Sequence, residues 1–135
     1  MAGSKEGSVA TANTSYQGKK FNQASGRGQT VDAMAQKLDS IPQKVKDASP
    51  EAVRQIEKAA GNPDAVITIY RATPGDSINT NDWVFLDKQN AEKWTKTAFG
   101  KPKPGYQVLE VKVKAKDVDW TGKNLEFTYI GRKSV

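Results

Sequence analysis

The feature that most constrains the fold is an apolar run, VITIYRATP, at residues 66–74. Its β-branched and aromatic side chains favour a strand, and turn-forming residues at 61–64 come directly before it. We therefore expect a central strand over residues 66–71, buried on at least one face. The strand ends in Arg71, where an unpaired charge is costly to bury. Two interpretations stay open: Arg71 pairs with a carboxylate of the fold or reaches water, or its guanidinium binds an anionic ligand.

The segments on either side of this strand predict an α+β protein. Before the strand, apolar residues at helical spacing predict helices over residues 30–41 and 50–60. After it, the pattern predicts strands over 82–87, 109–114 and 125–130, and a helix over 88–97 that Asp87 caps. The expected fold class is α+β, with a mixed or antiparallel β-sheet core and N-terminal helices.

Composition divides the chain into an arm and one domain. Residues 1–29 are rich in Gly, Ser, Ala, Thr, Asn, Gln and Lys, so we expect a flexible N-terminal arm. Residues 30–135 suffice for a single domain with a modest core, and we expect residues 131–135 to be frayed. No apolar run approaches the length that spans a bilayer. We therefore expect a soluble, cytoplasmic monomer without a membrane partner.

The missing residue types exclude several kinds of chemistry. The sequence contains no cysteine and no histidine. Disulfides, thiol nucleophiles, Ser-His-Asp triads and histidine metal sites are therefore excluded, and we expect no metal. The formal net charge of +6 favours an anionic ligand or partner. A small nuclease is disfavoured, because only Asp117 and Asp119 come close to a carboxylate cluster.

Two charged residues lie inside otherwise apolar strands. Arg71 stands between Tyr70 and Ala72, and Glu126 stands between Leu125 and Phe127. If both strands belong to one sheet system, the two charged side chains could open into one cleft. The alternative is structural: Arg71 and Glu126 form an ion pair, or Glu126 faces water on an edge strand.

Three blocks of the sequence together resemble a known family. VITIYRATP, then DWVFLDKQNAEKW, then GYQVLEVKVKAKDVDWTGKNLEFTYIG stand in the order and spacing of a small ADP-ribosyltransferase-like family of phage-encoded and bacterial polymorphic-toxin proteins. That family typically reads YRAxP, then GDWVTLS and a helix, then GYxVLxxxVPAxDLxWxGxxxNEWGY. The similarity covers roughly residues 50–131 and belongs to the Arg–Ser–Glu branch. It implies an ADP-ribosyltransferase-like sheet core.

The resemblance implies roles for two residues. The family's first-strand arginine, which holds the phosphate and ribose side of NAD, falls on Arg71. The family's catalytic glutamate falls on Glu126, where it would bond a hydroxyl of the nicotinamide ribose and stabilise the oxocarbenium-like centre as nicotinamide leaves. Cleavage of a glycosidic bond to a cationic leaving group benefits from such a fixed negative charge.

Other positions follow the family less closely. The NAD-binding segment falls on Ala72 and on Phe85, Leu86 and Asp87, where the hydroxyls of the family's Ser-Thr-Ser-type strand are missing. Asn124 stands on the acceptor side, where arginine-modifying members carry Glu or Gln. These departures disfavour arginine as the acceptor.

Two functions are therefore expected from the resemblance. The first is a mono-ADP-ribosyltransferase, an effector or toxin that uses NAD as substrate to modify a protein or nucleic acid in a bacterial host. The second is a catalytically inactive domain of the same fold, which binds protein or nucleic acid through a basic surface.

The tryptophans and one basic loop have two interpretations each. Trp83, Trp94 and Trp120 most simply pack in or beside the core, with Trp94 directed inward, although one of them could stack on a ligand ring. Lys101 and Lys103 lie in a Pro- and Gly-rich loop, which is either solvated or covers a ligand phosphate.

Overall fold

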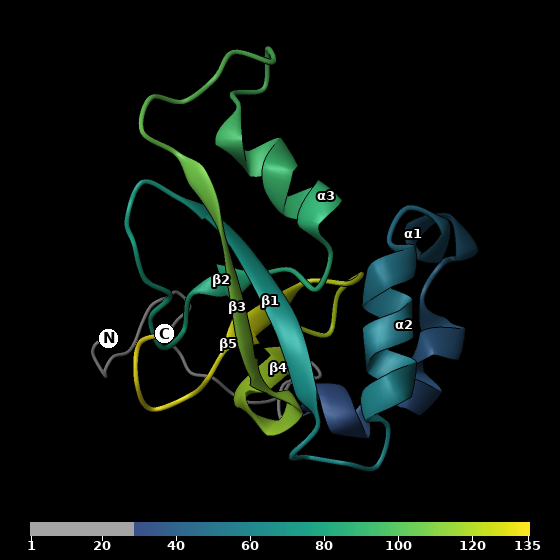
Figure 1. Cartoon of the computed structure of the whole chain (residues 1–135). Helices are drawn as coiled ribbons and strands as arrows, with labels where there is room; N and C mark the ends of the chain where they lie inside the picture. Colours follow the sequence, from purple (N-terminus) through teal and green to yellow (C-terminus); the bar gives the residue numbers. More distant parts are fainter. Residues whose placement is uncertain (1–28) are drawn as a thin grey trace.

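Two small antiparallel sheets form the centre of the protein (Figure 1). A computed structural model of the chain describes residues 29–135, so the arm expected over residues 1–29 lies, apart from Gln29, outside the described residues. The first sheet pairs β1 (Val66–Thr73) with β3 (Gln107–Lys114). The second has the order β2 (Trp83–Val84), β5 (Phe127–Tyr129), β4 (Val118–Trp120). The α+β class is therefore confirmed, with antiparallel pairing throughout the described strands.

One pair of backbone hydrogen bonds joins the two sheets. Tyr70 and Phe85 exchange both N–H···O bonds, at 2.8 and 2.9 Å. On one side of this bridge the two chain segments separate, and the side chain of Gln55 fills the gap. Its Nε2 donates to the carbonyls of Thr68 and Leu86, at 2.8 and 3.0 Å, and its Oε1 accepts from Thr68 N at 2.7 Å. A glutamine amide thus replaces the missing rung of the ladder.

Short helices surround the sheets. In chain order they are η1 (Val31–Ala33), η2 (Ala35–Ser40), α1 (Gln43–Asp47), α2 (Pro50–Ala59), α3 (Lys88–Glu92), η3 (Lys93–Thr95) and η4 (Ala115–Asp117). The helix predicted over residues 50–60 is confirmed, with proline at its first turn and Ala52, Ile56 and Ala59 buried. The helix over residues 88–97 forms in part, as α3 followed by η3. In the described part of the chain, none of these helices is long and apolar enough to cross a membrane.

The helix predicted over residues 30–41 is wrong in type. The segment forms two 3₁₀ helices, in which Ala33, Lys37 and Ile41 each donate to the carbonyl three residues earlier. The expected apolar residues are nevertheless buried: Val31, Met34, Leu38 and Ile41. A 3₁₀ helix has about three residues per turn, so residues spaced by three share a face. The apolar spacing was read correctly, but it suits the tighter helix as well.

The prediction that residues 131–135 are frayed is wrong, because the C-terminal segment is held by hydrogen bonds. Ile78 and Val135 exchange two backbone hydrogen bonds, at 2.7 and 2.9 Å, and Tyr129 Oη donates to the carbonyl of Lys133 at 2.7 Å. The ring of Tyr129 also lies against Gly131, where a Cβ atom would overlap it. The chain end therefore closes over the loop between β1 and β2.

Replacing Gln55 should weaken the junction between the sheets. We predict that Gln55→Ala lowers the free energy of unfolding by about 1–3 kcal/mol, because the part-buried backbone groups of Thr68 and Leu86 lose their partner. The exposed Gln43 on α1 bonds only Asp47 on the same helix, so Gln43→Ala should cost less than about 0.5 kcal/mol. Urea unfolding measures both, and equal costs would contradict the role given to Gln55.

A second prediction concerns alkaline pH. Tyr70 Oη donates to Glu51 Oε2 at 2.8 Å, and burial, this hydrogen bond and the charge of Glu51 together raise the pKa of Tyr70 above its usual value. The unfolded chain therefore ionises at Tyr70 first, so stability should fall as the pH rises above about 10. Tyr70→Phe should fall less steeply, with a residual slope from Tyr129, whose pKa burial also raises. Parallel curves of unfolding free energy against pH would contradict this prediction.

Candidate active site

A cavity opens beside the Tyr70–Phe85 bridge, on the side away from Gln55. Its volume is about 650 Å³, which is within the usual range for a small-molecule site. Its lining comes from β1, from the segment that contains β2, from α3 and η3, from the loop before β3 and from the turn before β5: Arg71, Ala72, Trp83, Phe85, Asn90, Lys93, Trp94, Lys103, Tyr106 and Glu126. Arg71 and Glu126, far apart in sequence, thus line the same cavity. The prediction that both lie within strands is wrong for Glu126, which precedes β5, and β1 and β5 belong to different sheets.

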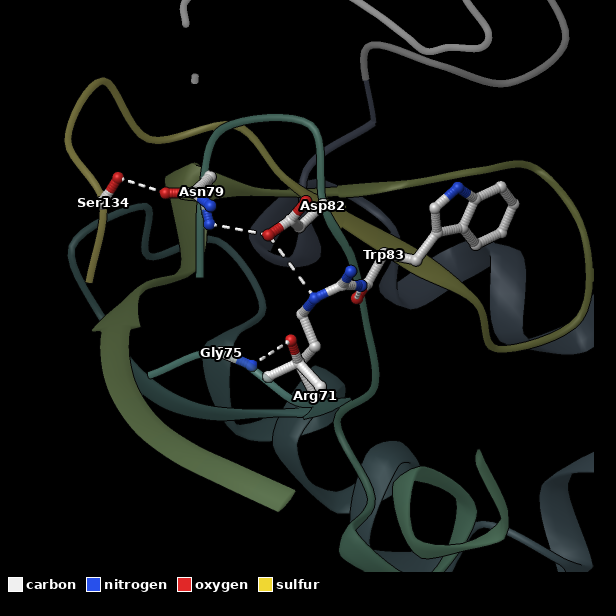
Figure 2. A network of polar contacts seen from close by, with 7 residues as sticks. Arg71, Gly75, Asn79, Asp82, Trp83 and Ser134 are labelled. Atoms are coloured by element: carbon white, nitrogen blue, oxygen red, sulfur yellow. Dashed lines mark hydrogen bonds and ion pairs between the residues drawn. The ribbon is translucent and has the colours of Figure 1, made fainter. Parts of the chain in front are cut away.

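The guanidinium of Arg71 is held by the segment that leads into β2 (Figure 2). Its Nε lies 3.4 Å from Oδ2 of Asp82, and its Nη1 donates to the carbonyl of Trp83 at 2.8 Å. Asp82 is fixed in turn, because the same Oδ2 accepts from Asn79 N at 2.8 Å. The carboxylate that pairs with Arg71 is therefore Asp82 and not Glu126. The remaining donors of the five-donor guanidinium can face the cavity that Arg71 lines.

Glu126 has a different environment. Its backbone is held by a turn, in which Thr121 N donates to the carbonyl of Glu126 at 3.1 Å and Glu126 N donates to the carbonyl of Lys123 at 3.3 Å. Its side chain is half-buried at the cavity wall. Within residues 29–135 no ion pair or hydrogen bond of its carboxylate is found. The turn therefore fixes the backbone that carries Glu126, and the carboxylate itself makes no polar contact in the described fold.

Aromatic rings form much of the cavity rim. Trp83 and Trp94 are 52% and 59% exposed, and Tyr106 is 37% exposed. The prediction that Trp94 packs inward is wrong, although Ala91 on the same helix is buried as expected. Only Trp120 is in the core, and its Nε1 donates to the carbonyl of Asn124 at 2.8 Å. Two of the three tryptophans are thus available for stacking on a ligand.

The other residues singled out in the sequence are divided between the cavity and the fold. Ala72 and Phe85 line the cavity. Leu86 is fully buried in the core, and Asp87, also buried, accepts from Asn90 N at 3.2 Å and so caps α3 as predicted. Asn124 lies in the turn before Glu126 with a positive φ of 50°, and its side chain is not part of the lining.

Sequence reasoning missed several lining residues. Asn90, Lys93 and Tyr106 enter the cavity because α3 and the loop before β3 fold over the end of β1, which no local pattern predicts. Asp82 was predicted only as the first residue of a strand, and no local pattern identifies it as the partner of Arg71, since Asp76 is nearer in the sequence. In the range 29–135, no cluster of three or more acidic or metal-ligating side chains could hold a metal ion.

Comparisons with family models, with curated proteins and with solved structures found no match.

The exposure of the tryptophans can be tested by fluorescence. We predict that the double variant Trp83→Phe/Trp94→Phe, in which only the buried Trp120 emits, has a blue-shifted emission and is quenched weakly by acrylamide. The Trp120→Phe variant should be quenched several-fold more strongly. Equal quenching of the two variants would mean that the cavity rim is closed in solution.

Proposed function

We propose that the protein is a mono-ADP-ribosyltransferase that transfers ADP-ribose from NAD to a macromolecular acceptor in the cytoplasm of a bacterial cell. The observation that carries the proposal is the cavity that Arg71 and Glu126 both line without pairing with each other, because the ion-pair partner of Arg71 is Asp82. The resemblance of residues 50–131 to an ADP-ribosyltransferase-like family supplies the chemistry, and the ADP-ribosyltransferase-like fold is part of the proposal.

Arg71 would bind the pyrophosphate of NAD. Two of its N–H groups are used by Asp82 and by the carbonyl of Trp83, so the guanidinium is oriented before ligand binds. Preorganised, charge-assisted hydrogen bonds to phosphate are among the stronger polar contacts in proteins. Lys93 and Lys103 on the same cavity wall add positive charge for the two phosphates.

The rings of NAD would occupy the aromatic part of the cavity. Trp83, Phe85 and Trp94 offer faces on which adenine or nicotinamide can stack. Thr68 and Tyr70 on β1 direct their backbone N–H and C=O groups toward the gap between the sheets. Because backbone groups in a strand alternate in direction, those of Ala72, two residues further on, face the same way. An edge of this kind can hydrogen-bond a carboxamide.

Glu126 would act at the reacting centre. As the bond between C1′ of the ribose and nicotinamide breaks, its electron pair leaves with neutral nicotinamide and positive charge develops on the ribose. A fixed carboxylate beside this centre stabilises the charge, most strongly where the site excludes water. A nucleophile of the acceptor then bonds C1′ and gives up its proton, and Asn124, in the turn next to Glu126, is on the acceptor side.

A second candidate function is an inactive binding domain. It is favoured by the positions of Leu86 and Asp87, because Leu86 is buried in the core and Asp87 caps α3. Neither supplies a hydroxyl to the cavity, so the nicotinamide ribose would have to be positioned by Glu126 and the aromatic rim alone. NAD cleavage separates the two functions directly.

Replacing Glu126 tests the proposal. We predict that Glu126→Gln melts within a few degrees of the parent, because the carboxylate stabilises no partner in the described fold, while release of nicotinamide from NAD falls by at least about a hundredfold. Glu110→Gln, on the exposed face of β3, is the matched control and should retain activity.

The parent protein decides between the two functions. NAD cleavage that is present in the parent, lost in Glu126→Gln and retained in Glu110→Gln supports the transferase. A parent that binds macromolecules but leaves NAD intact supports the inactive binding domain. A large drop in the melting temperature of Glu126→Gln with cleavage retained would refute the role given to Glu126.

A further inference from the structure

A basic, aromatic segment projects from the cavity rim. We call residues 93–106, between α3 and β3, the lysine–aromatic arm. It carries Lys93, Lys96, Lys101 and Lys103 and no acidic residue. Figure 1 shows that it extends past the ends of the strands, beyond α3. Four positive charges without an acidic residue among them therefore stand next to the candidate active site.

Hydrogen bonds within the lysine–aromatic arm order its backbone. Thr97 N donates to the carbonyl of Lys101 and Lys103 N donates to the carbonyl of Thr95, both at 2.8 Å, and Lys96 and Pro102 form a β-bridge. Thr97 Oγ1 also accepts from the backbone N–H groups of Phe99 and Lys101. The backbone at the tip of the arm, from which the side chain of Phe99 projects, therefore has a defined conformation.

This ordered tip holds an aromatic side chain in water. Phe99 is 91% exposed, the highest value among the exposed large apolar residues, and Trp94 at the base of the arm is 59% exposed. In the described fold the Phe99 ring is almost uncovered, and more than half of Trp94 is open to solvent. Lys103 Nζ lies 4.8 Å from the centre of the Tyr106 ring, so lysines and rings alternate along the arm down to the cavity.

Exposed rings interleaved with lysines have a particular partner chemistry. Lysines attract a phosphate backbone, and each exposed ring can stack on a base whose face is free. Base faces are free in single strands and hidden in a duplex. Four lysines without a carboxylate favour a polyanion, and the exposed ring among them favours a polyanion that offers base faces for stacking.

We propose that the lysine–aromatic arm binds single-stranded nucleic acid and presents it to the cavity as the acceptor of ADP-ribose. This inference rests on the proposed transferase function and names its acceptor class. In the transfer, the C1′–nicotinamide bond breaks, a lone pair on the nucleic acid forms the new bond to C1′, and the proton that this atom carried passes to solvent. Nicotinamide is the leaving group, and no oxidant or metal takes part.

Binding tests the arm without requiring catalysis. Fluorescence anisotropy with labelled single strands of twenty thymidines or twenty uridines should show binding that weakens steeply between about 50 and 200 mM salt, and a duplex of equal length should bind more weakly. Phe99→Ala should weaken single-strand binding about tenfold, Phe99→Trp should retain it, and Lys101→Gln should flatten the salt dependence.

Matched controls lie outside the arm. Val66→Ala removes another exposed apolar side chain, and Lys44→Gln removes another exposed lysine, on α1. Both should bind as the parent does. Equal losses in Val66→Ala and Phe99→Ala, or a duplex bound as tightly as a single strand, would overturn the proposal.

Transfer is then measured separately from cleavage of NAD. With the parent, labelled ADP-ribose should appear on the oligonucleotide. At oligonucleotide concentrations below saturation, this labelling should fall about tenfold with Phe99→Ala. Nicotinamide release without acceptor should be unchanged in this variant, because Phe99 is not part of the cavity lining. Labelling of proteins but not of oligonucleotides would overturn the acceptor class and leave the transferase intact. Absence of nicotinamide release from the parent would refute the transferase function. The anisotropy result would then show only whether the lysine–aromatic arm binds single-stranded nucleic acid.

Discussion

The two backbone hydrogen bonds between Tyr70 and Phe85 are the constraint on which the rest of the structure depends. They join the sheets at one point, and the segments separate on both sides of it. On one side the side-chain amide of Gln55 hydrogen-bonds the backbone groups of Thr68 and Leu86 that have no strand partner. On the other side a side chain again replaces a backbone donor, because the guanidinium of Arg71 donates to the carbonyl of Trp83. The cavity exists because the sheets diverge there and are not closed by further ladder bonds.

Arg71 therefore serves the fold and the cavity together. A hydrogen bond from a charged donor is worth about 1.5–3 kcal/mol, and the partly exposed pair with Asp82 adds at most about 1 kcal/mol. These contacts are enough to orient the guanidinium but use only part of its donor capacity. The sequence left two interpretations of Arg71 open, a structural ion pair or an anion-binding group. The geometry makes them compatible, since the structural partner is Asp82 and the cavity face stays accessible.

Local patterns predicted the parts of the structure that depend on local physics. Alternation predicted β3, the apolar run predicted β1, and Asp87 was recognised as a helix cap, because each depends on neighbours in sequence. The exposure of Trp94 and the pairing of Arg71 with Asp82 could not be predicted in this way. Both depend on segments that meet only after folding, since Arg71 lies on β1, Asp82 comes just before β2, and Trp94 lies in η3 beside the cavity. The same holds for the cavity as a whole, whose lining comes from segments that meet only after folding.

The position of Glu126 is best understood against the alternative of a collapsed ion pair. Two opposite charges that line one cavity gain energy by approaching each other, so a purely structural role would favour direct contact between Arg71 and Glu126. Two features oppose that contact. The guanidinium is held back by Asp82 and the carbonyl of Trp83, and the backbone of Glu126 is fixed by the turn of residues 121–126. A charge kept half-buried and without a partner lowers stability, and folds retain such charges chiefly where a ligand supplies the missing interaction. In the proposed function the ligand supplies these interactions: the developing positive charge on the ribose lies beside Glu126, and the phosphates lie beside Arg71.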